Sequence, residues 1–125
     1  MTEPSGTMAN QVALPVLTHP GDDVIVSRES HAVWHETGAS AANSGAQFTA
    51  IGAKGAFTLD EFLEAIKPRG HVIYPPTTLV EIDNTHNRAG GVIFPDSVCT
   101  HPTHHSGSDT PFQPTWLSYA AEPKR

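Results

Sequence analysis

Apolar residues at helical spacing mark the first helix that this sequence predicts, and a start and a stop signal mark the second. Met8, Val12 and Val16 recur four residues apart, which predicts a helix over this stretch despite an internal proline. A second helix is expected to begin at Ser30 as its cap and to continue to about position 43. A glycine just beyond that point is a typical stop signal for a helix.

A third helix is predicted by its start signal. Thr58 and Glu61 have the spacing of a capping box, in which the threonine oxygen accepts the amide of the third helical residue and the glutamate reaches back to the cap amide. We expect this helix to turn Phe62, Leu63 and Ile66 inward and to stop at the proline that follows.

Three short apolar runs predict strands that alternate with these helices. They lie at residues 24–26, 47–51 and 78–82. Alternating helices and apolar strands indicate an α/β unit with a mostly parallel sheet. A parallel sheet needs both faces covered, and the chain offers few helices for that, so we expect an incomplete architecture.

The chain changes character after residue 95. Proline, serine, threonine and histidine dominate residues 96–125, which hold few apolar groups to offset an ordering cost of about 1–2 kcal/mol per residue. We expect residues 1–95 to form a partial domain and residues 96–125 to be a divergent, disordered or weakly docked tail. Trp116, Leu117 and Tyr119 are the side chains in this tail that could still pack.

Composition and charge exclude several classes of protein. The 125 residues carry 7 Lys and Arg against 13 Asp and Glu, a net charge of −6 without any basic cluster, which argues against a nucleic-acid binder. No apolar run approaches the roughly 18–20 residues that span a bilayer, and no signal peptide is visible. The single cysteine, Cys99, cannot form an internal disulfide. We therefore expect a cytoplasmic protein without a membrane or nucleic-acid partner.

The turn at Ser5, Gly6 and Thr7 is a candidate phosphate site because it lies directly before a helix start. Free amides at that end, a glycine that permits close approach and two hydroxyl groups together suit an anion. The alternative is an ordinary helix cap, which is far commoner.

Two histidine positions are candidates for chemistry at the ends of strands. His31 begins the second predicted helix, where its ring could stack on a planar cofactor or, together with His35, bind a metal ion. His86 lies in a dense polar run after the last strand and could accept a proton at neutral pH. For each of them a satisfied polar side chain in a turn or core is the alternative. A further cluster in the tail consists of His101, His104 and His105.

Taken in order, these loops resemble a known family. The matching stretches read PSGTMANQVAL, PGDDVIVSRESHAVWHETGASAANSGAQF, FTLDEFLEAIKPRG and IDNTHNRAGGVIFP. They are similar to the low-specificity L-threonine aldolases, within the aromatic amino acid β-eliminating lyases that use pyridoxal phosphate. The resemblance implies an incomplete fragment of the large domain of a fold-type-I, aspartate aminotransferase-like enzyme. The family it points to is homo-oligomeric and acts on an amino acid as its small-molecule substrate.

The resemblance also implies roles for individual residues. Ser5, Gly6 and Thr7 would bind the phosphate of pyridoxal phosphate, and His31 would stack on its pyridine ring. His86 would lie near the substrate hydroxyl during cleavage of a β-hydroxy-α-amino acid, such as threonine to glycine and acetaldehyde. His31 and His86 are thus the expected catalytic residues, and no metal is expected.

The chain departs from the family pattern in three respects. The segment with a substrate-contacting serine, the D-G-A-R stretch whose aspartate pairs with the pyridine nitrogen and the loop with the Schiff-base lysine are absent from this sequence. The lysines present are Lys54, Lys67 and Lys124, each expected to be a solvated charge. We therefore expect a truncated, frameshifted or naturally short lyase chain that is inactive alone. The rival hypotheses are a non-catalytic remnant that docks on intact lyase subunits or binds a phosphate ligand, and a small metal protein.

Overall fold

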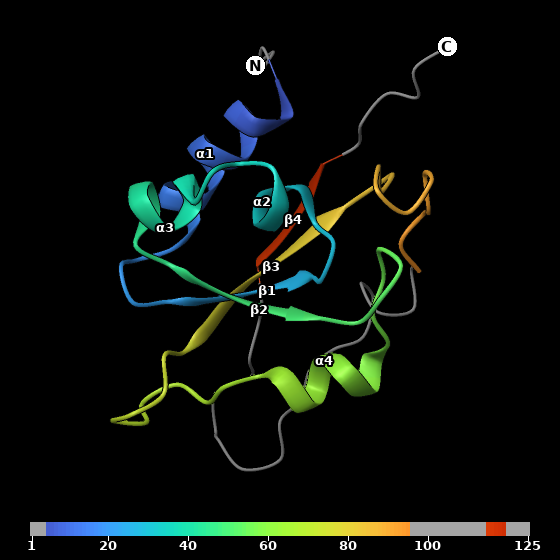
Figure 1. Ribbon diagram of the computed structural model, residues 1–125. Coiled ribbons are helices and arrows are strands. Elements are labelled where there is room, and N and C mark those ends of the chain that lie inside the picture. Colours follow the sequence, from blue (N-terminus) through green and yellow to red (C-terminus); the bar gives the residue numbers. More distant parts are fainter. Residues whose placement is uncertain (1–4, 96–114, 120–125) are drawn as a thin grey trace.

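The computed structural model describes residues 5–95 and 115–119 of the chain, and its strands form one sheet (Figure 1). The strand order is β2-β1-β3-β4, and every neighbouring pair runs parallel. The strands are β1 (Asp23–Ser27), β2 (Gln47–Ile51), β3 (Thr77–Asp83) and β4 (Thr115–Tyr119). The expected parallel α/β sheet is therefore confirmed, and each predicted strand is present.

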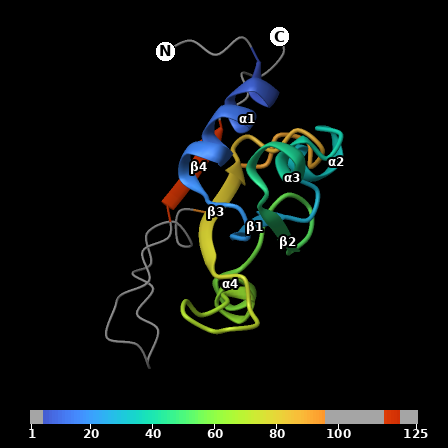
Figure 2. The ribbon, with the colours of Figure 1, turned by 90° about the vertical axis from the view of Figure 1, so that its left-hand side faces the viewer.

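The helices cover the two faces of this sheet unequally. They are α1 (Gly6–Leu17), α2 (His31–Trp34), α3 (Ala39–Ser44) and α4 (Leu59–Ala65). α1, α2 and α3 lie on one face and α4 lies on the other (Figures 1 and 2). Each face has its own apolar cluster, because successive side chains of a strand point to opposite sides. Leu14 packs with Val24, Val26 and Leu79 under α1. Phe62 packs with Ile25, Val80 and Ile82 under α4.

The face that α1 buries differs from the one that the apolar spacing marks. Met8, Val12 and Val16 are exposed, whereas Asn10 and Leu14 are buried against the rest of the chain. The expected helix is present and accommodates its internal proline. The side of a helix that faces the core depends on what the helix packs against. The buried side of α1 carries the polar residue Asn10, so the apolar spacing did not indicate it.

The second predicted helix is in fact two helices. Thr37 and Gly38 have positive φ angles of 53° and 72°, a left-handed conformation that ends one helix before α3 begins. Ser30 precedes α2 as expected, but its side chain makes no capping hydrogen bond. Gly45, with φ of 66°, ends α3 as predicted.

The capping box of α4 is confirmed. The Thr58 hydroxyl accepts the Glu61 amide at 3.2 Å, and a Glu61 carboxylate oxygen accepts the Thr58 amide at 2.8 Å. Phe62 and Ile66 are buried as predicted, but the prediction that Leu63 turns inward is wrong, because this side chain is exposed.

The tail contributes the edge strand of the sheet. β4 pairs with β3 from Leu79↔Thr115 to Asp83↔Tyr119, so five residues of the segment expected to be disordered or weakly docked form a strand at the sheet edge. The remaining residues of 96–125 lie outside the described part of the chain, and so does the histidine cluster in the tail. No helix among the described residues is long and apolar enough to cross a membrane.

A buried ion pair closes the amino-terminal edge of the sheet. The Asp23 carboxylate is fully buried and lies 2.8 Å from the ammonium group of Lys67, which follows α4. The same carboxylate accepts hydrogen bonds from Thr49 at 2.6 Å and Thr77 at 2.9 Å. The expectation that Lys67 is a solvated charge is therefore wrong: its side chain is only 27% exposed and joins the α4 segment to the sheet.

Candidate functional site

Two of the predicted histidines meet at the carboxyl-terminal edge of the sheet. His31 follows β1 and His86 follows β3, and these two strands are parallel neighbours. Asp83, the last residue of β3, lies between them: one of its oxygens accepts the His31 amide at 2.7 Å and lies 3.6 Å from Nε2 of His86. This edge is where ligands of open α/β sheets bind.

His86 is held inside the chain through both ring nitrogens. Its side chain is 1% exposed, and Nε2 lies 3.1 Å from the hydroxyl of Ser27 at the end of β1. The Ala89 amide donates to Nδ1 at 3.3 Å, so the proton of the neutral ring lies on Nε2. A side-chain carbon at Gly55 would come within 2.6 Å of the ring, so only glycine lets the turn after β2 pack here.

His31 is oriented by a buried carboxylate. Its Nδ1 lies 3.0 Å from Oε1 of Glu36, while its own side chain remains 42% exposed. Glu36 also accepts hydrogen bonds from Asn10 at 2.8 Å and Gln11 at 2.6 Å, both on α1. The hydrogen bond to Glu36 places the ring proton on Nδ1 and leaves Nε2 as the nitrogen that could accept from a ligand.

The sequence reasoning missed Glu36 altogether, because its partners lie on a different helix. The only signal was a charged residue inside a predicted helix, two positions before a glycine, which is too common to be informative. Its position explains why the chain breaks the helix at this point: the turn carries the Glu36 carboxylate back toward α1.

Replacing Glu36 by glutamine should destabilise the chain by about 1–2 kcal/mol, because a charged acceptor of three donors becomes a neutral one with a single acceptor oxygen. Urea unfolding at neutral pH measures this effect. Glu64→Gln, on the exposed side of α4, is the matched control and should change stability by less than about 0.5 kcal/mol. Equal stability of the two variants would show that Glu36 does not hold these partners together.

The Ser5–Thr7 turn begins α1 at the same end of the molecule. The Ser5 hydroxyl accepts the Met8 amide at 3.2 Å, which is the ordinary capping bond. The first amides of a helix have no partner within it, so Gly6 and Thr7 present donors there. Among the described residues no hydrogen bond joins this turn directly to either histidine. The connection runs through Asn10 on α1 and the Glu36 carboxylate.

Two further polar groups on this side of the sheet are buried without a partner. The Ser30 hydroxyl and both carboxylate oxygens of Glu81 have no hydrogen bond among the described residues. Burial raises the pKa of Glu81 to about 8, and the neighbouring carboxylates of Asp83 and Glu36 add to this effect. Neither group was singled out from the sequence as buried and unpaired.

The described residues hold no group of three or more His, Cys, Asp and Glu side chains that could bind a metal ion. His31 and His35 do lie together, with ring centroids 5.2 Å apart, but the rings are tilted by 44° and no third ligand joins them in this part of the chain.

Comparison with known proteins agrees with this geometry. The threonine aldolase of Leishmania major has a similar structure, with a TM-score of 0.59 and 25% sequence identity over 66% of this chain and 24% of that one. Low-specificity L-threonine aldolase 1 of Arabidopsis thaliana is 33% identical over 96 residues, which is 70% of this chain and 26% of that protein. An uncharacterized protein of Caenorhabditis elegans is 34% identical over 94 residues, or 73% of this chain and 22% of its own length.

The chain therefore spans about a quarter of the length of the relatives that it matches. Its α/β fold is a partial version of the fold-type-I architecture that the resemblance implied, which confirms that expectation. Residues 1–101 match the model of the beta-eliminating lyases. On these grounds the chain belongs to the beta-eliminating lyase family and is similar to the threonine aldolases.

Proposed function

We propose that this chain forms part of the cofactor and substrate site of a lyase that cleaves β-hydroxy-α-amino acids, such as L-threonine to glycine and acetaldehyde. The family and its threonine aldolase relatives support this class of reaction. The observation that carries the proposal is the meeting of His31 and His86 at Asp83, on the sheet edge where ligands bind.

The residues on this edge fit pyridoxal phosphate as the cofactor. Free amides and a hydroxyl at Gly6 and Thr7 suit its phosphate, and the half-exposed His31 ring suits its planar ring. The buried, unpartnered hydroxyl of Ser30, next to His31, is an oxygen that a polar ligand could satisfy. When bound, pyridoxal phosphate supplies the electron sink for the bond that breaks.

His31 and His86 would then have different tasks. Glu36 holds the His31 ring in one orientation and one tautomer, which suits a residue that covers a planar ligand. His86 would take the proton of the substrate hydroxyl at Nδ1, the nitrogen that carries the lone pair in the neutral ring. Nδ1 accepts a long hydrogen bond from the Ala89 amide at 3.3 Å. This hydrogen bond must break before Nδ1 can accept the proton of the substrate.

The positions of the lysines support the proposal that this chain is inactive alone. Lys67 is bound to Asp23 at the opposite edge of the sheet, and Lys54 lies in an exposed turn. Lys124 lies outside the described residues. A covalent bond to the cofactor needs a lysine amine beside it, so the chain by itself should not produce glycine from threonine.

Binding of pyridoxal phosphate to the purified chain tests the proposal without requiring turnover. Calorimetry should give a saturable isotherm, and pyridoxal without its phosphate should bind at least about tenfold more weakly. Thr7→Val should weaken binding of the phosphate form alone. His31→Ala should weaken the binding of both pyridoxal and pyridoxal phosphate. His31→Phe should restore much of the lost affinity because it keeps a flat ring.

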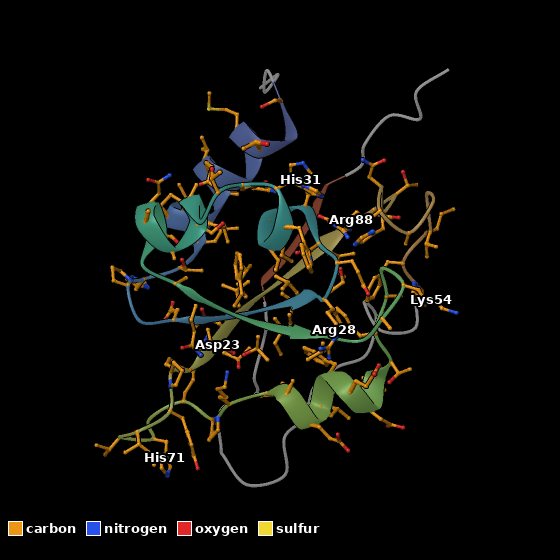
Figure 3. The ribbon with its side chains drawn as sticks, in the orientation of Figure 1. Asp23, Arg28, His31, Lys54, His71 and Arg88 are labelled. Atoms are coloured by element: carbon orange, nitrogen blue, oxygen red, sulfur yellow. The ribbon has the colours of Figure 1, made fainter. Side chains whose placement is uncertain are left out.

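His71→Ala is the matched control, since His71 lies at the other end of the molecule from His31 (Figure 3) and should leave binding unchanged. Equal affinity for pyridoxal and its phosphate, or no effect of Thr7→Val and His31→Ala, would refute the assignment of these residues to the cofactor.

A second candidate function is docking on an intact lyase subunit. The exposed apolar residues Met8, Val12 and Val16 on the outer side of α1 favour it, because such a stripe on a helix is normally covered. Co-purification with a full-length homologue would support this role, and a lone aggregating monomer would count against it.

A further inference from the structure

His86 is covered by a short turn that follows β2. This turn comprises residues 53–56 and lies at the carboxyl-terminal edge of the sheet, like His86 itself. A side-chain carbon built on Gly55 would lie 2.6 Å from the imidazole ring, so the backbone of the turn packs directly on His86. Because the His86 side chain is 1% exposed, a substrate hydroxyl can reach it only after one of the groups around the ring has moved.

The turn is closed, but its conformation does not suit one of its residues. Ala53 and Ala56 exchange two backbone hydrogen bonds, at 3.0 and 3.3 Å. The two central residues, Lys54 and Gly55, have positive φ angles of 56° and 80°, as in the tight turns of type I′. Glycine and asparagine adopt a positive φ readily, whereas a lysine does so at a cost in free energy. Opening of the turn would let Lys54 return to an ordinary negative φ.

The other groups around His86 are part of the central sheet or of its own turn. Ser27 and Asp83 are the last residues of β1 and β3, the two central strands, which pair with each other. The turn over residues 86–92 is tied to His86 itself by two backbone hydrogen bonds of 2.9 Å. Moving any of these groups would disturb the strands or the backbone that positions the ring.

The loop after β1 holds the 53–56 turn at two points. At the base of the turn, Nε of Arg28 donates to the carbonyl oxygen of Gly52 at 3.1 Å. At the tip, a carboxylate oxygen of Glu29 accepts the Gly55 amide at 3.2 Å. Gly52 has a φ of 69°, and a side chain there would collide with the returning backbone, so this position needs the conformational freedom of glycine. Release of the Glu29 contact would free the tip while the base stays attached.

We propose that residues 53–56 form a lid over His86, with Gly52 as its hinge and Glu29 as its latch. The structure shows the closed position. In the open position the Gly55 amide leaves Glu29 and the imidazole becomes accessible. The lid follows from these contacts alone, and only its task of admitting a substrate hydroxyl rests on the proposed function. Figure 3 shows Lys54, at the tip of the lid, at the outer margin of the chain and far from His71.

Acylation by diethyl pyrocarbonate, which attacks accessible neutral imidazoles, tests the lid without any substrate. Mass spectrometry follows the reaction in the peptide that contains His86, with the exposed His71 of the same chain as the reference. Glu29→Ala should raise the rate at His86 by at least about fivefold, because the lid loses a charged acceptor. Glu29→Gln keeps an acceptor oxygen and should give a rate between those of the parent and Glu29→Ala. Lys54→Asn should lower the rate by about threefold, because asparagine is favoured at this position of the turn.

Glu64→Ala is the matched control, because it removes a carboxylate from the exposed side of α4 and should leave the rate at His86 unchanged. Urea at concentrations below the unfolding transition separates lid opening from unfolding. Opening exposes little surface, so the rate at His86 should hardly depend on urea. A rate that rises with urea as steeply as unfolding does would overturn the inference. Equal rates in the parent and Glu29→Ala, or equal rates in Glu29→Ala and Glu29→Gln, would overturn it as well.

The lid and the proposed function can fail separately. Unresponsive acylation of His86 together with intact binding of pyridoxal phosphate would remove the lid and leave the proposed function standing. Acylation that responds to Glu29 and Lys54 as expected, in a chain that does not bind pyridoxal phosphate, would support the lid and count against the proposed function.

Discussion

Replacing Asp23 by alanine is expected to destabilise the chain by about 3–5 kcal/mol, the usual cost of leaving a buried ion pair and its hydrogen bonds without one partner. The Asp23 carboxylate is fully buried and accepts from Lys67, Thr49 and Thr77, with Gln47 as a fourth donor at 3.1 Å. Its loss removes the acceptor that these donors share at the amino-terminal edge of the sheet. Urea unfolding followed by circular dichroism measures the difference.

The partner of this pair provides a second measurement if Asp23→Ala does not fold. Lys67→Met should cost less than Asp23→Ala, because the carboxylate keeps its three neutral donors and Lys67 is already 27% exposed. The double variant should lose less than the sum of the two single losses, since each single change removes the same contact. Strictly additive losses would mean that the pair contributes nothing to stability. Glu64→Ala, on the exposed face of α4, should change stability by less than about 0.5 kcal/mol.

Replacing Glu81 by glutamine is expected to stabilise the chain, by an amount that grows as the pH rises from about 5 to 8. Burial raises the pKa of Glu81 to about 8 from its ordinary value of 4.5. Between these two values the folded chain holds a proton that the unfolded chain releases. Stability therefore falls by up to about 1.4 kcal/mol for each pH unit across this window, and above pH 8 this loss stays constant. Glutamine has no ionisable proton, so the variant should lack this fall in stability with rising pH.

Unfolding by urea at pH 5, 6.5 and 8 tests this prediction. At pH 5 the parent and Glu81→Gln should differ little, because the carboxyl is neutral in the folded chain and matches the amide in shape. At pH 8 the variant should be the more stable of the two. Glu64→Gln controls for the loss of a carboxyl on the surface and should follow the parent at every pH. A constant difference between parent and Glu81→Gln would show that this carboxyl is ionised and solvated in the folded chain.

Most of the helices and strands could be predicted because their signals involve residues only a few positions apart in the sequence. The capping box needs only Thr58 and Glu61, three positions apart on one turn, and it formed as expected. The break between α2 and α3 could not be predicted in this way. It brings Glu36 to Asn10 and Gln11, and no local pattern indicates a partner on another helix. Leu63 was placed inward for a similar reason: spacing alone does not tell which side of α4 meets the sheet.

For the candidate site, the sequence indicated which loops carry the candidate residues but not which of these residues contact one another. His31 and His86 could be picked out because each follows an apolar strand. Asp83 was part of the same polar run, but its position between them was not evident. The contact between Glu29 and Gly55 gave no signal at all, because a carboxylate and a backbone amide so far apart in the chain have no recognisable spacing.

By itself, the sequence determined the kind of protein: an α/β chain with parallel strands, the loops at their carboxyl ends and membership of the beta-eliminating lyases. These properties follow from short-range periodicity and from motifs that keep their order along the chain. Only the tertiary structure decided which polar groups are buried together, such as Lys67 with Asp23 and Glu36 with His31, and which stay alone, such as Glu81. The physical reason is that the cost of burying a charge depends on partners that the sheet brings together from distant segments.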